Sequence, residues 1–517
     1  MAEQAPGAHP PLTGGTLAVG TMVVSLATFM NVLDVSIANV SIPAIAGDLG
    51  VSPNQGTWVI TSFAVANAIS VPLTGWLSQR FGNVRLFLAT VVLFVLASLL
   101  CGLALSMNML ILFRVIQGAV AGPMIPLSQT LLLASYPREK GGTALAMFSL
   151  TVLVAPVVGP LLGGWITDNI SWPWIFFINV PVGVVSAILT WVIYRDRDTP
   201  RRKAPIDAVG LVLLVVWVGS LQIMLDKGKD LDWFGSGFII ALAVVAAFAF
   251  LLFLVWELTD EHPVVDLRLF ARRNFWTGTL SISLSYGAYF GSIVLLPLWL
   301  QQYLGYTATQ AGWALAPVGA LALILTPLVG RTSGRVDPRL FATAALVIFA
   351  IVAAMRGAFN AQVDLGTLII PTVIQGAAVS CFFIPLVALS LSGLRPDQIA
   401  AASGLNNFAR ITAGAFATSI ATTLWENRAS LHHAQLAEHI SRSSPAVTDA
   451  LGKLASAGLS PEQSYGVINQ IVNQQAFTMA AVDLFNASAV LLVLLIPLVW
   501  LTRPVRSIAD AGAGAAH

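Results

Sequence analysis

The chain consists of long apolar runs separated by shorter polar connections. Each run is close to the length of about 20 residues that an α-helix needs to cross a bilayer. The runs predict fourteen spanning helices, over residues 16–42, 55–77, 86–105, 109–133, 144–167, 172–193, 207–226, 237–257, 275–300, 310–330, 340–358, 367–392, 402–424 and 478–501. We therefore expect an all-α membrane protein with 14 transmembrane helices.

Two pairs of similar sequence segments indicate an internal repeat. The second and tenth runs share one set of residues at a constant interval, which pairs Gln55, Trp58, Pro72, Leu73 and Gly75 with Gln310, Trp313, Pro327, Leu328 and Gly330. The fourth and twelfth runs share the letters VIQGA, at 115–119 and 373–377. Matched runs are an even number of helices apart, so the two halves are expected to be parallel. Such halves suit alternating access around a central cavity.

The repeat divides the chain into two bundles of six helices with two inserted helices between them. In chain order we expect an N-terminal tail (1–15), the first bundle (16–193), the inserted helices with their linkers (194–274), the second bundle (275–501) and a C-terminal tail (502–517). One long connection, residues 425–477, belongs to the second bundle. It is longer than joining two helices requires, so we expect a partner site or a cap over the outer mouth.

Composition agrees with a membrane protein and excludes several functions. Hydrophobic residues make up 57% of the 517 residues and charged residues 10%, against about 25% charged residues in soluble domains. A net charge of +2 gives no reason to expect a nucleic-acid partner. Cys101 and Cys381 lie in separate apolar runs and predict neither a disulfide nor a metal site. The polar connections carry no phosphate-binding loop or Ser/His/Asp set, which argues against an ATPase or another enzyme.

The basic residues predict the orientation of the chain, because loops on the cytoplasmic side are enriched in lysine and arginine. With an even number of helices both termini share a side, and most of the 26 lysines and arginines fall on it. The residues expected on the opposite side are Lys227, Lys229, Arg356, Arg428, Arg442 and Lys453. Both termini are therefore expected in the cytoplasm. The first apolar run lacks the basic start and cleavage site of a signal peptide, so we expect it to be retained.

Asp34 is an acidic residue inside the first apolar run. On a helix it shares a small or polar stripe with Ala27, Asn31, Ala38 and Ser41. A carboxylate in a membrane-length helix is costly, so it normally faces a protein interior or a water-filled cavity and marks an ion or substrate path. Asp34 is therefore a candidate proton site, and Asn31 a candidate cavity residue. The alternative is a structural pair with a neighbouring helix.

Arg114 in the fourth run is the expected partner of Asp34. Measured from the outer ends of their helices, the two residues lie at depths of roughly 9 and 12 Å. Gln117 extends the face of Arg114 toward the expected cavity. An arginine favours the charged form of a carboxylate and burial disfavours it, so a group between these effects can bind and release a proton. A permanent ion pair is the alternative.

Two glycine-containing segments are candidates for gating. Residues 75–85, GWLSQRFGNVR, connect the second and third helices and carry basic residues at the inner surface, where an ordinary anchor is the alternative. Residues 155–164, APVVGPLLGG, repeat small residues every four positions, a pattern that allows close helix contact. Pro156 and Pro160 remove helix donors. We expect a shaped or hinged helix here, in which Gly159, Gly163 and Gly164 matter for packing or movement.

Further candidates lie in the second bundle and in the long connection. Tyr286, Tyr289 and Phe290 are candidate substrate contacts. Asn406 and Arg410 are four residues apart, and Arg410 either reaches the interface with its long side chain or lines the cavity. Residues 426–440 have a helix-forming composition. The adjacent histidines His432 and His433 point to different faces of such a helix, which favours a solvated surface over a metal site.

These segments together resemble the major facilitator superfamily, and within it the fourteen-span drug:proton antiporter branch. LDVSIANVSIPAI at 33–45 resembles the first-helix motif of the branch, and residues 75–85 its loop motif. FRVIQGAVAG at 113–122 resembles the fourth-helix motif, and residues 155–164 the antiporter motif of the fifth helix. The loop motif departs from the family at Gln79 and at Asn83-Val84. Four of its positions are therefore carried over as gating residues, namely Gly75, Arg80, Gly82 and Arg85.

The resemblance implies the MFS fold and a proton-driven exporter of hydrophobic drugs in the inner membrane of a Gram-negative bacterium. The proton gradient would be the energy source, without a cofactor, and Asp34 and Arg114 would couple protons to transport. Helices one, four, seven and ten of the twelve-helix core would line the cavity. The resemblance also implies an EmrA-type periplasmic adaptor and a TolC-type outer-membrane channel. The alternatives are export of an endogenous metabolite or siderophore, and a non-transporting scaffold or sensor.

Overall fold

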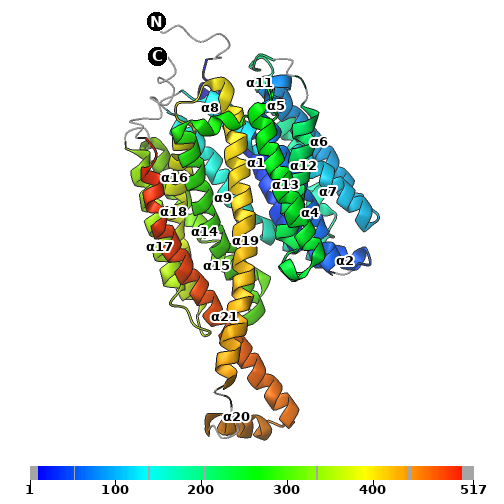
Figure 1. The fold of residues 1–517 in the computed structure, drawn as a ribbon, viewed down its shortest axis with the longest axis vertical. Helices are drawn as coiled ribbons and strands as arrows, with labels where there is room; N and C mark the ends of the chain where they lie inside the picture. Colours follow the sequence, from blue (N-terminus) through cyan, green and yellow to red (C-terminus); the bar gives the residue numbers. More distant parts are fainter. Residues whose placement is uncertain are drawn as a thin grey trace.

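The structure, a computed structural model, describes residues 10–51, 53–137, 140–201, 205, 207–332, 336–438, 440 and 445–503. These residues form α-helices joined by short turns and contain no β-strand, which confirms the all-α expectation. The helices run roughly parallel to one long axis (Figure 1). Helix α1 begins, and the final helix ends, at the same end of the bundle, called the terminal end below; the opposite end is the hairpin end.

The first bundle contains the helices α1 to α11. Their bounds are α1 Gly14–Val40, α2 Ile42–Asp48, α3 Pro53–Gly56, α4 Trp58–Ser70, η1 Val71–Leu73, α5 Thr74–Phe81, α6 Asn83–Gly102, α7 Met107–Ala121, α8 Met124–Ser135, α9 Gly141–Asn169, α10 Trp174–Phe177 and α11 Asn179–Tyr194. Several predicted spans consist of consecutive helices; in two of them Pro72 and Pro123 lack the amide that would continue one helix.

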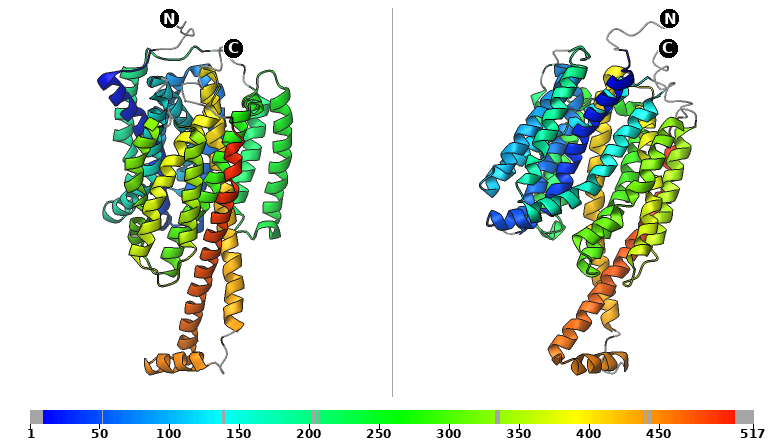
Figure 2. Two further views of the ribbon diagram at one scale, coloured as in Figure 1. Left: turned by 90° about the vertical axis from the view of Figure 1, so that its left-hand side faces the viewer. Right: turned by 180° about the vertical axis from the view of Figure 1, so that it is seen from behind.

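The inserted helices and the second bundle follow. Their bounds are α12 Ala208–Lys227, η3 Trp233–Gly235, α13 Gly237–Thr259, η4 Leu267–Ala271, α14 Arg273–Tyr303, α15 Ala308–Leu315, α16 Val318–Thr332, α17 Pro338–Arg356, α18 Leu365–Leu391, η5 Pro396–Gln398, α19 Ile399–Glu438, α20 Pro445–Ser456, α21 Pro461–Leu494 and α22 Ile496–Trp500. Helices α12 and α13 pack against each other beside the first bundle (Figures 1 and 2).

Among the described residues, 12 helical segments are long and apolar enough to cross a membrane. The predicted spans 144–167 and 402–424 are not among them, although both are helical, within α9 and α19. For 402–424 the composition of α19 explains the difference, because this helix is rich in alanine, serine, threonine and asparagine. The count of 14 spans therefore stays a prediction.

The outward faces of the helices are apolar. On α13 the exposed side chains include Val244, Phe248 and Val255, which are all more than half exposed. Large apolar side chains on the outside of a water-soluble protein would be unfavourable, whereas lipid solvates them. This surface is therefore the one that contacts the bilayer.

The internal repeat is present in the contacts between helices as well as in the sequence. A Cβ atom added to Gly118 of α7 would lie 2.3 Å from the carbonyl oxygen of Phe63 on α4. A Cβ atom added to Gly376 of α18 would lie 2.3 Å from the carbonyl oxygen of Val318 on α16, the residue that corresponds to Phe63. In both halves glycine thus lets the fourth helix touch the backbone of the second.

The two halves meet at the terminal end through another pair of equivalent glycines. A Cβ atom on Gly75 of α5 would lie 2.5 Å from Cβ of Ala401 on α19. A Cβ atom on Gly330 of α16 would lie 2.8 Å from Cβ of Ala146 on α9. Each half therefore places a glycine against a helix of the other half, and the bundle is closed at these two positions of the terminal end.

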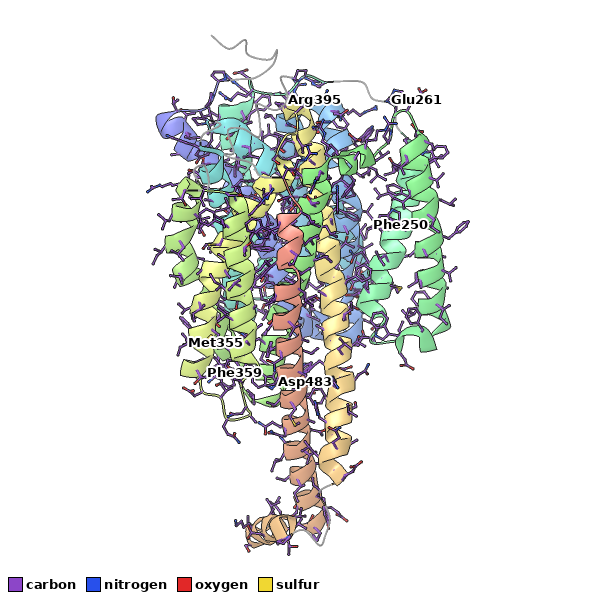
Figure 3. All side chains as sticks on the ribbon, turned by 60° about the vertical axis from the view of Figure 1, so that its left-hand side comes forward. Phe250, Glu261, Met355, Phe359, Arg395 and Asp483 are labelled. Carbon is purple, nitrogen blue, oxygen red and sulfur yellow. The ribbon has the colours of Figure 1, made fainter. Side chains whose placement is uncertain are left out.

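Helices α19 and α21 extend far beyond the bundle at the hairpin end, and α20 lies across the tip (Figures 1 and 2). The long connection 425–477 is therefore largely a continuation of two spanning helices. Near the base of this hairpin, where Figure 3 labels Asp483, Nε2 of His432 lies 2.9 Å from Oδ2 of Asp483. The expectation that His432 lies on a solvated surface is wrong, because this side chain is only 13% exposed.

Candidate functional site: a buried ion pair in the first bundle

Asp34 and Arg114 form an ion pair in the interior of the first bundle. Nη1 of Arg114, on α7, donates to Oδ2 of Asp34, on α1, at 2.5 Å. Both side chains are 0% exposed. The two helices bring together the charges that their depths in the sequence predict to meet.

The other carboxylate oxygen of Asp34 accepts two hydrogen bonds from amide side chains. Nε2 of Gln117 donates to Oδ1 at 3.0 Å, and Nδ2 of Asn179 donates to it at 2.9 Å. Ser98 accepts from both amides, at 3.2 and 3.0 Å, and donates to the carbonyl oxygen of Phe176 at 3.0 Å. The carboxylate is thus fully hydrogen-bonded in a dry site, as a buried charge must be.

Arg114 is held by more than the carboxylate. Its Nε donates to the carbonyl oxygen of Val59 at 2.9 Å, and its Nη1 also donates to Oε1 of Gln117 at 2.7 Å. The guanidinium carbon lies 4.3 Å from the ring centre of Phe63 and 5.6 Å from that of Phe176. Aromatic faces stabilise a desolvated cation, so the arginine has partners that would remain if Asp34 became neutral.

Sequence reasoning missed Ser98 and Asn179, because neither stands out in its apolar run. Asn179 is the first residue of α11 and follows the aromatic segment of α10, and Ser98 lies near the C-terminal end of α6. An asparagine inside a predicted span is itself a signal, since polar side chains within membrane helices bond to neighbouring helices.

The antiporter-like segment 155–164 packs directly against α1, one turn beyond Asp34. A Cβ atom on Gly159 would lie 2.5 Å from Oγ of Ser36, and one on Gly163 would lie 2.8 Å from the carbonyl oxygen of Ile37. Pro156 and Pro160 lie within α9, but their side chains are outside the described part of the chain. The small face of α9 therefore sets the position of the α1 segment that carries Asp34.

Adjacent glycines of α9 provide a matched test of this contact. We expect Gly163→Ala to destabilise the bundle by about 1–3 kcal/mol, because the added methyl group overlaps the backbone of α1. Gly164→Ala is the control, since its Cβ would meet nothing nearer than Val40 Cγ1 at 3.9 Å. The measurement is the thermal unfolding midpoint in detergent together with drug transport. Equal behaviour of the two variants would show that the close approach has no consequence.

The remaining cavity candidates do not gather in one place. Asn31 is buried in the first bundle and donates to the carbonyl oxygen of Ala121 at 3.1 Å. Asn406 donates to Oγ1 of Thr279 and Oγ of Ser390, both at 3.2 Å. Both are satisfied by helix-to-helix hydrogen bonds in this structure, so their predicted contact with substrate remains a prediction.

A cluster of aromatic side chains surrounds Arg410 in the second bundle. The rings of Tyr286 and Phe290 are stacked at 5.2 Å, and Tyr289 lies 6.4 Å from Tyr286. The guanidinium carbon of Arg410 lies 5.0 Å from the ring centre of Tyr286 and 5.5 Å from that of Phe383. Arg410 is only 7% exposed, so its side chain does not reach the membrane interface. That it lines the cavity stays a prediction.

The second bundle contains a counterpart of the first-bundle site in which the carboxylate is replaced. Tyr289 occupies the position that corresponds to Asp34, and Gln375 corresponds to Gln117. Nη2 of Arg356 donates to Oε1 of Gln375 at 2.5 Å, and Arg356 is 2% exposed. Arg356 is the last residue of α17 and is buried; its expected side of the membrane stays a prediction. The two halves thus share a buried arginine and glutamine, but only the first has the acid.

The loop motif 75–85 is held by a residue that the sequence did not single out, Asp198. The backbone of Gly82 has φ +86°, and a Cβ atom there would lie 2.4 Å from Oδ1 of Asp198. The same oxygen accepts from the backbone amide of Val84 at 3.0 Å, at the start of α6. Nε of Arg85 lies 3.5 Å from Oδ2. The loop motif of the family usually has an aspartate where this chain has Gln79. In this chain Asp198, from outside the motif, places a carboxylate against the loop.

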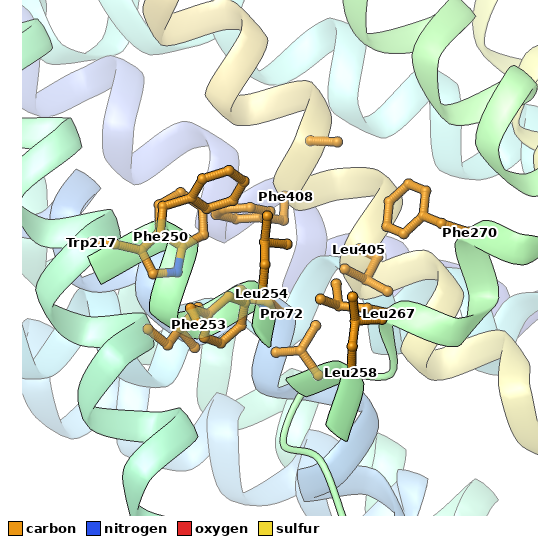
Figure 4. A pocket seen from close by; sticks show the side chains of 13 residues that line it. Pro72, Trp217, Phe250, Phe253, Leu254, Leu258, Leu267, Phe270, Leu405 and Phe408 are labelled. Atoms are coloured by element: carbon orange, nitrogen blue, oxygen red, sulfur yellow. The ribbon is translucent and has the colours of Figure 1, made fainter. Parts of the chain in front are cut away.

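An apolar cavity of about 370 Å³ separates the inserted helices from α19 (Figure 4). Its walls include Trp217 of α12, Phe250 and Phe253 of α13, and Leu405 and Phe408 of α19. Trp217 contacts three of these rings, with ring centres 5.0 to 5.8 Å away. None of the predicted cavity residues lines this space.

Two repeated helix bundles, an apolar outer surface and one buried ion pair define a membrane transporter with two pseudo-symmetric halves. The comparison with known families agrees: the profile of the Major Facilitator Superfamily matches residues 24–418. The chain belongs to the major facilitator superfamily and is a transporter, not an enzyme.

Several characterised relatives match over nearly the whole chain. The chain is 52% identical to the multidrug export protein EmrB of Escherichia coli over 98% of this chain and 99% of the relative. It is 49% identical to the fatty acid resistance protein FarB of Neisseria gonorrhoeae over 96% of this chain and 98% of the relative. Among solved structures, the proton:xylose symporter XylE matches with a TM-score of 0.59 and 13% identity over 96% of this chain and 98% of that one. That likeness confirms the MFS fold.

Proposed function

We propose that the chain is a proton-driven multidrug exporter, the inner-membrane part of a tripartite pump for hydrophobic toxic compounds. The observation that carries this is the fully buried pair of Asp34 and Arg114 in a transporter closely similar to a multidrug export protein. A buried acid in a membrane helix is expensive, and proton binding is the work that such a group can do at this position.

Protonation of Asp34 would exchange one set of contacts for another. The neutral acid loses its attraction for Arg114, which keeps Val59, Gln117 and the ring of Phe63. Because α1 is packed on the small face of α9, a shift of α1 would be transmitted to the fifth helix. Proton binding and release would in this way bias the two ends between open and closed, as alternating access requires.

The drug would bind between the halves, and the aromatic cluster of Tyr286, Tyr289 and Phe290 with Arg410 is the proposed contact surface in the second half. Aromatic faces accept varied apolar molecules. The excess of basic residues at the terminal end supports the orientation with both termini in the cytoplasm. The hairpin of α19 and α21 would then project into the periplasm.

The hairpin is the proposed docking element for an EmrA-type adaptor, which in turn would meet a TolC-type channel. Its helices extend beyond the apolar bundle and expose apolar side chains away from the lipid-facing surface, among them Leu431, Tyr465 and Ile471. Exposed apolar side chains on such an extension fit a protein partner better than water.

We expect Ile471→Asp to weaken adaptor binding, because this side chain is 58% exposed on the hairpin and a charge there would have to be desolvated in an interface. Gln475→Glu, on the same helix and also exposed, is the control for added charge. Co-purification with the adaptor measures binding, and drug transport in adaptor-free proteoliposomes should be unchanged in both variants. Undiminished adaptor binding in Ile471→Asp would exclude this part of the hairpin as the contact.

The function is tested with purified protein in proteoliposomes that enclose a pH-sensitive dye. With a proton gradient imposed and a hydrophobic drug added, an antiporter moves protons in step with the drug. Drug transport that does not depend on the proton gradient would overturn the proposed function. Proton movement that is the same with and without the drug would also overturn it.

A further inference from the structure

Two carboxylates lie together at the terminal end of the inserted helices, far from the ion pair of the first bundle in sequence. Glu257 lies in the last turn of α13 and is 0% exposed. Asp207 precedes α12 and is 9% exposed. One oxygen of each has a donor: Oε2 of Glu257 accepts from the amide of Val265 at 3.1 Å, and Oδ1 of Asp207 accepts from the amide of Gly210 at 2.8 Å and from Nε1 of Trp256 at 3.0 Å.

The second oxygens of these carboxylates are buried without a hydrogen-bond partner, and they border the same small volume. These atoms are Oδ2 of Asp207 and Oε1 of Glu257. A Cβ atom on Gly210 would lie 2.2 Å from the first and 2.5 Å from the second. Both oxygens therefore lie against the bare backbone of Gly210, and any side chain there would displace both.

The charges around the pair do not neutralise it. Within the described part of the chain, neither Asp207 nor Glu257 belongs to an ion pair. Arg268 of η4 donates to the backbone oxygen of Asp260 instead. The charged and titratable groups of the neighbouring segment are Asp260, Glu261, His262, Asp266 and Arg268, while Arg202 and Lys203 of the preceding linker lie outside the described residues.

We propose that Asp207 and Glu257 share one proton and form a second protonation site, on the inserted helices. Two carboxylates this close in a dry site cannot both be ionised, so one of them holds a proton that the other accepts. Glu257 is the expected proton carrier, because its carboxylate has one hydrogen-bond donor whereas that of Asp207 has two. A metal ion fits poorly, since hard cations take six or more oxygen ligands and the described residues contain no group of three or more His, Cys, Asp or Glu side chains that could hold one.

The site is connected to the apolar cavity beside α19. Leu258 follows Glu257 directly and lines the cavity, as do Val265, whose amide donates to Glu257, and Leu267 (Figure 4). Loss of the shared proton would leave two like charges in contact and drive the end of α13 away from the start of α12. The proton thus keeps the segment 258–267 in place as one wall of the cavity.

Infrared difference spectroscopy between acidic and alkaline buffer tests the shared proton directly, because a protonated carboxylic acid has its own carbonyl band. We expect a band that titrates in the unmodified protein, is lost in Glu257→Gln, and titrates at lower pH in Asp207→Asn. Glu261→Gln is the matched control, since Glu261 is exposed on the following loop, where Figure 3 labels it. The experiment uses the full chain in detergent.

An unchanged band in both Glu257→Gln and Asp207→Asn would overturn the proposal, and so would a titration that depends on the sodium concentration. The outcome is independent of the proposed function, because the band of Asp34 is removed separately by Asp34→Asn. Failure of proton-coupled transport with an intact Glu257 band would count against the transport proposal alone.

Gly210 offers a second, structural test of the same site. We expect Gly210→Ala to shift or abolish the titrating band, because its methyl group would occupy the space between the two oxygens. Gly219→Ala on the same helix is the control, since its Cβ would meet only Cδ1 of Ile69 at 3.9 Å. Both variants are first checked for folding by the thermal unfolding midpoint. A folded Gly210→Ala protein with an unaltered band would contradict the geometry.

Discussion

Replacing Asp34 by asparagine is expected to reduce proton-driven drug export to the level of protein-free liposomes. Asparagine has nearly the shape of aspartate and keeps the acceptor for Gln117 and Asn179, but it cannot bind and release a proton in this pH range. The site loses its exchangeable proton, while Arg114 keeps the carbonyl oxygen of Val59, Gln117 and the ring of Phe63 as partners. Uphill export of a fluorescent drug from proteoliposomes with an imposed pH gradient measures the effect.

The control for this experiment is Asp168→Asn, which removes an exposed acid at the end of α9. This variant is expected to export as the unmodified protein does. Parallel loss of export in both variants would indicate a general effect of removing an acid, and full export in Asp34→Asn would remove Asp34 from the mechanism.

Arg114→Gln is expected to destabilise the first bundle strongly. It leaves the carboxylate of Asp34 in a dry site with amide donors only, and removing one partner of a buried ion pair costs about 3–5 kcal/mol. The double variant Asp34→Asn/Arg114→Gln is expected to recover most of this loss, because neither charge then remains buried. Thermal unfolding midpoints of the unmodified protein, both single variants and the double variant form the complete cycle.

This double-mutant cycle shows whether Asp34 and Arg114 depend on each other for stability or contribute independently. If the losses of stability simply added in the double variant, the two charges would not depend on each other, which would contradict the contact at 2.5 Å. The double variant is also expected to lack coupled export. Recovered stability without recovered export would distinguish the structural role of the pair from its role in transport.

Much of the fold and the centre of the site could be predicted from the sequence, because both depend on helix geometry. Helical spacing and depth along the helix were enough to bring Asp34 and Arg114 together. The repeated sequence segments identified the two halves. Gly118 and Gly376 make equivalent helix contacts in them. The all-α fold and the repeat follow from local patterns of apolar and small residues, while the orientation and the count of 14 spans stay predictions.

The parts that escaped prediction depend on which distant segments pack together. Asn179 donates to both Asp34 and Ser98 only because α11 packs against α1 and against α6 in the bundle. Asp207 and Glu257 are separated by two whole helices and meet because α12 and α13 are antiparallel. No periodicity within one segment contains this information.

In the long connection 425–477, the helix predicted for 426–440 is confirmed as the end of α19, but the start of α21 at Pro461 was not predicted. Its composition is polar, so hydropathy ends the spanning helices near 424 and 478, whereas the backbone continues as helix to Glu438 and resumes at Pro461. Helix formation does not require an apolar sequence, and Ser460 with Gln463 forms a capping box that starts α21 in polar surroundings.

The central claim is that Asp34 carries the proton that drives drug export. The most direct test is the simultaneous measurement of proton flux and drug flux in one proteoliposome preparation, for the unmodified protein and for Asp34→Asn. The account predicts that Asp34→Asn still exchanges drug down its concentration gradient, while the drug-linked proton flux disappears. A drug-linked proton flux in Asp34→Asn equal to that of the unmodified protein would contradict it.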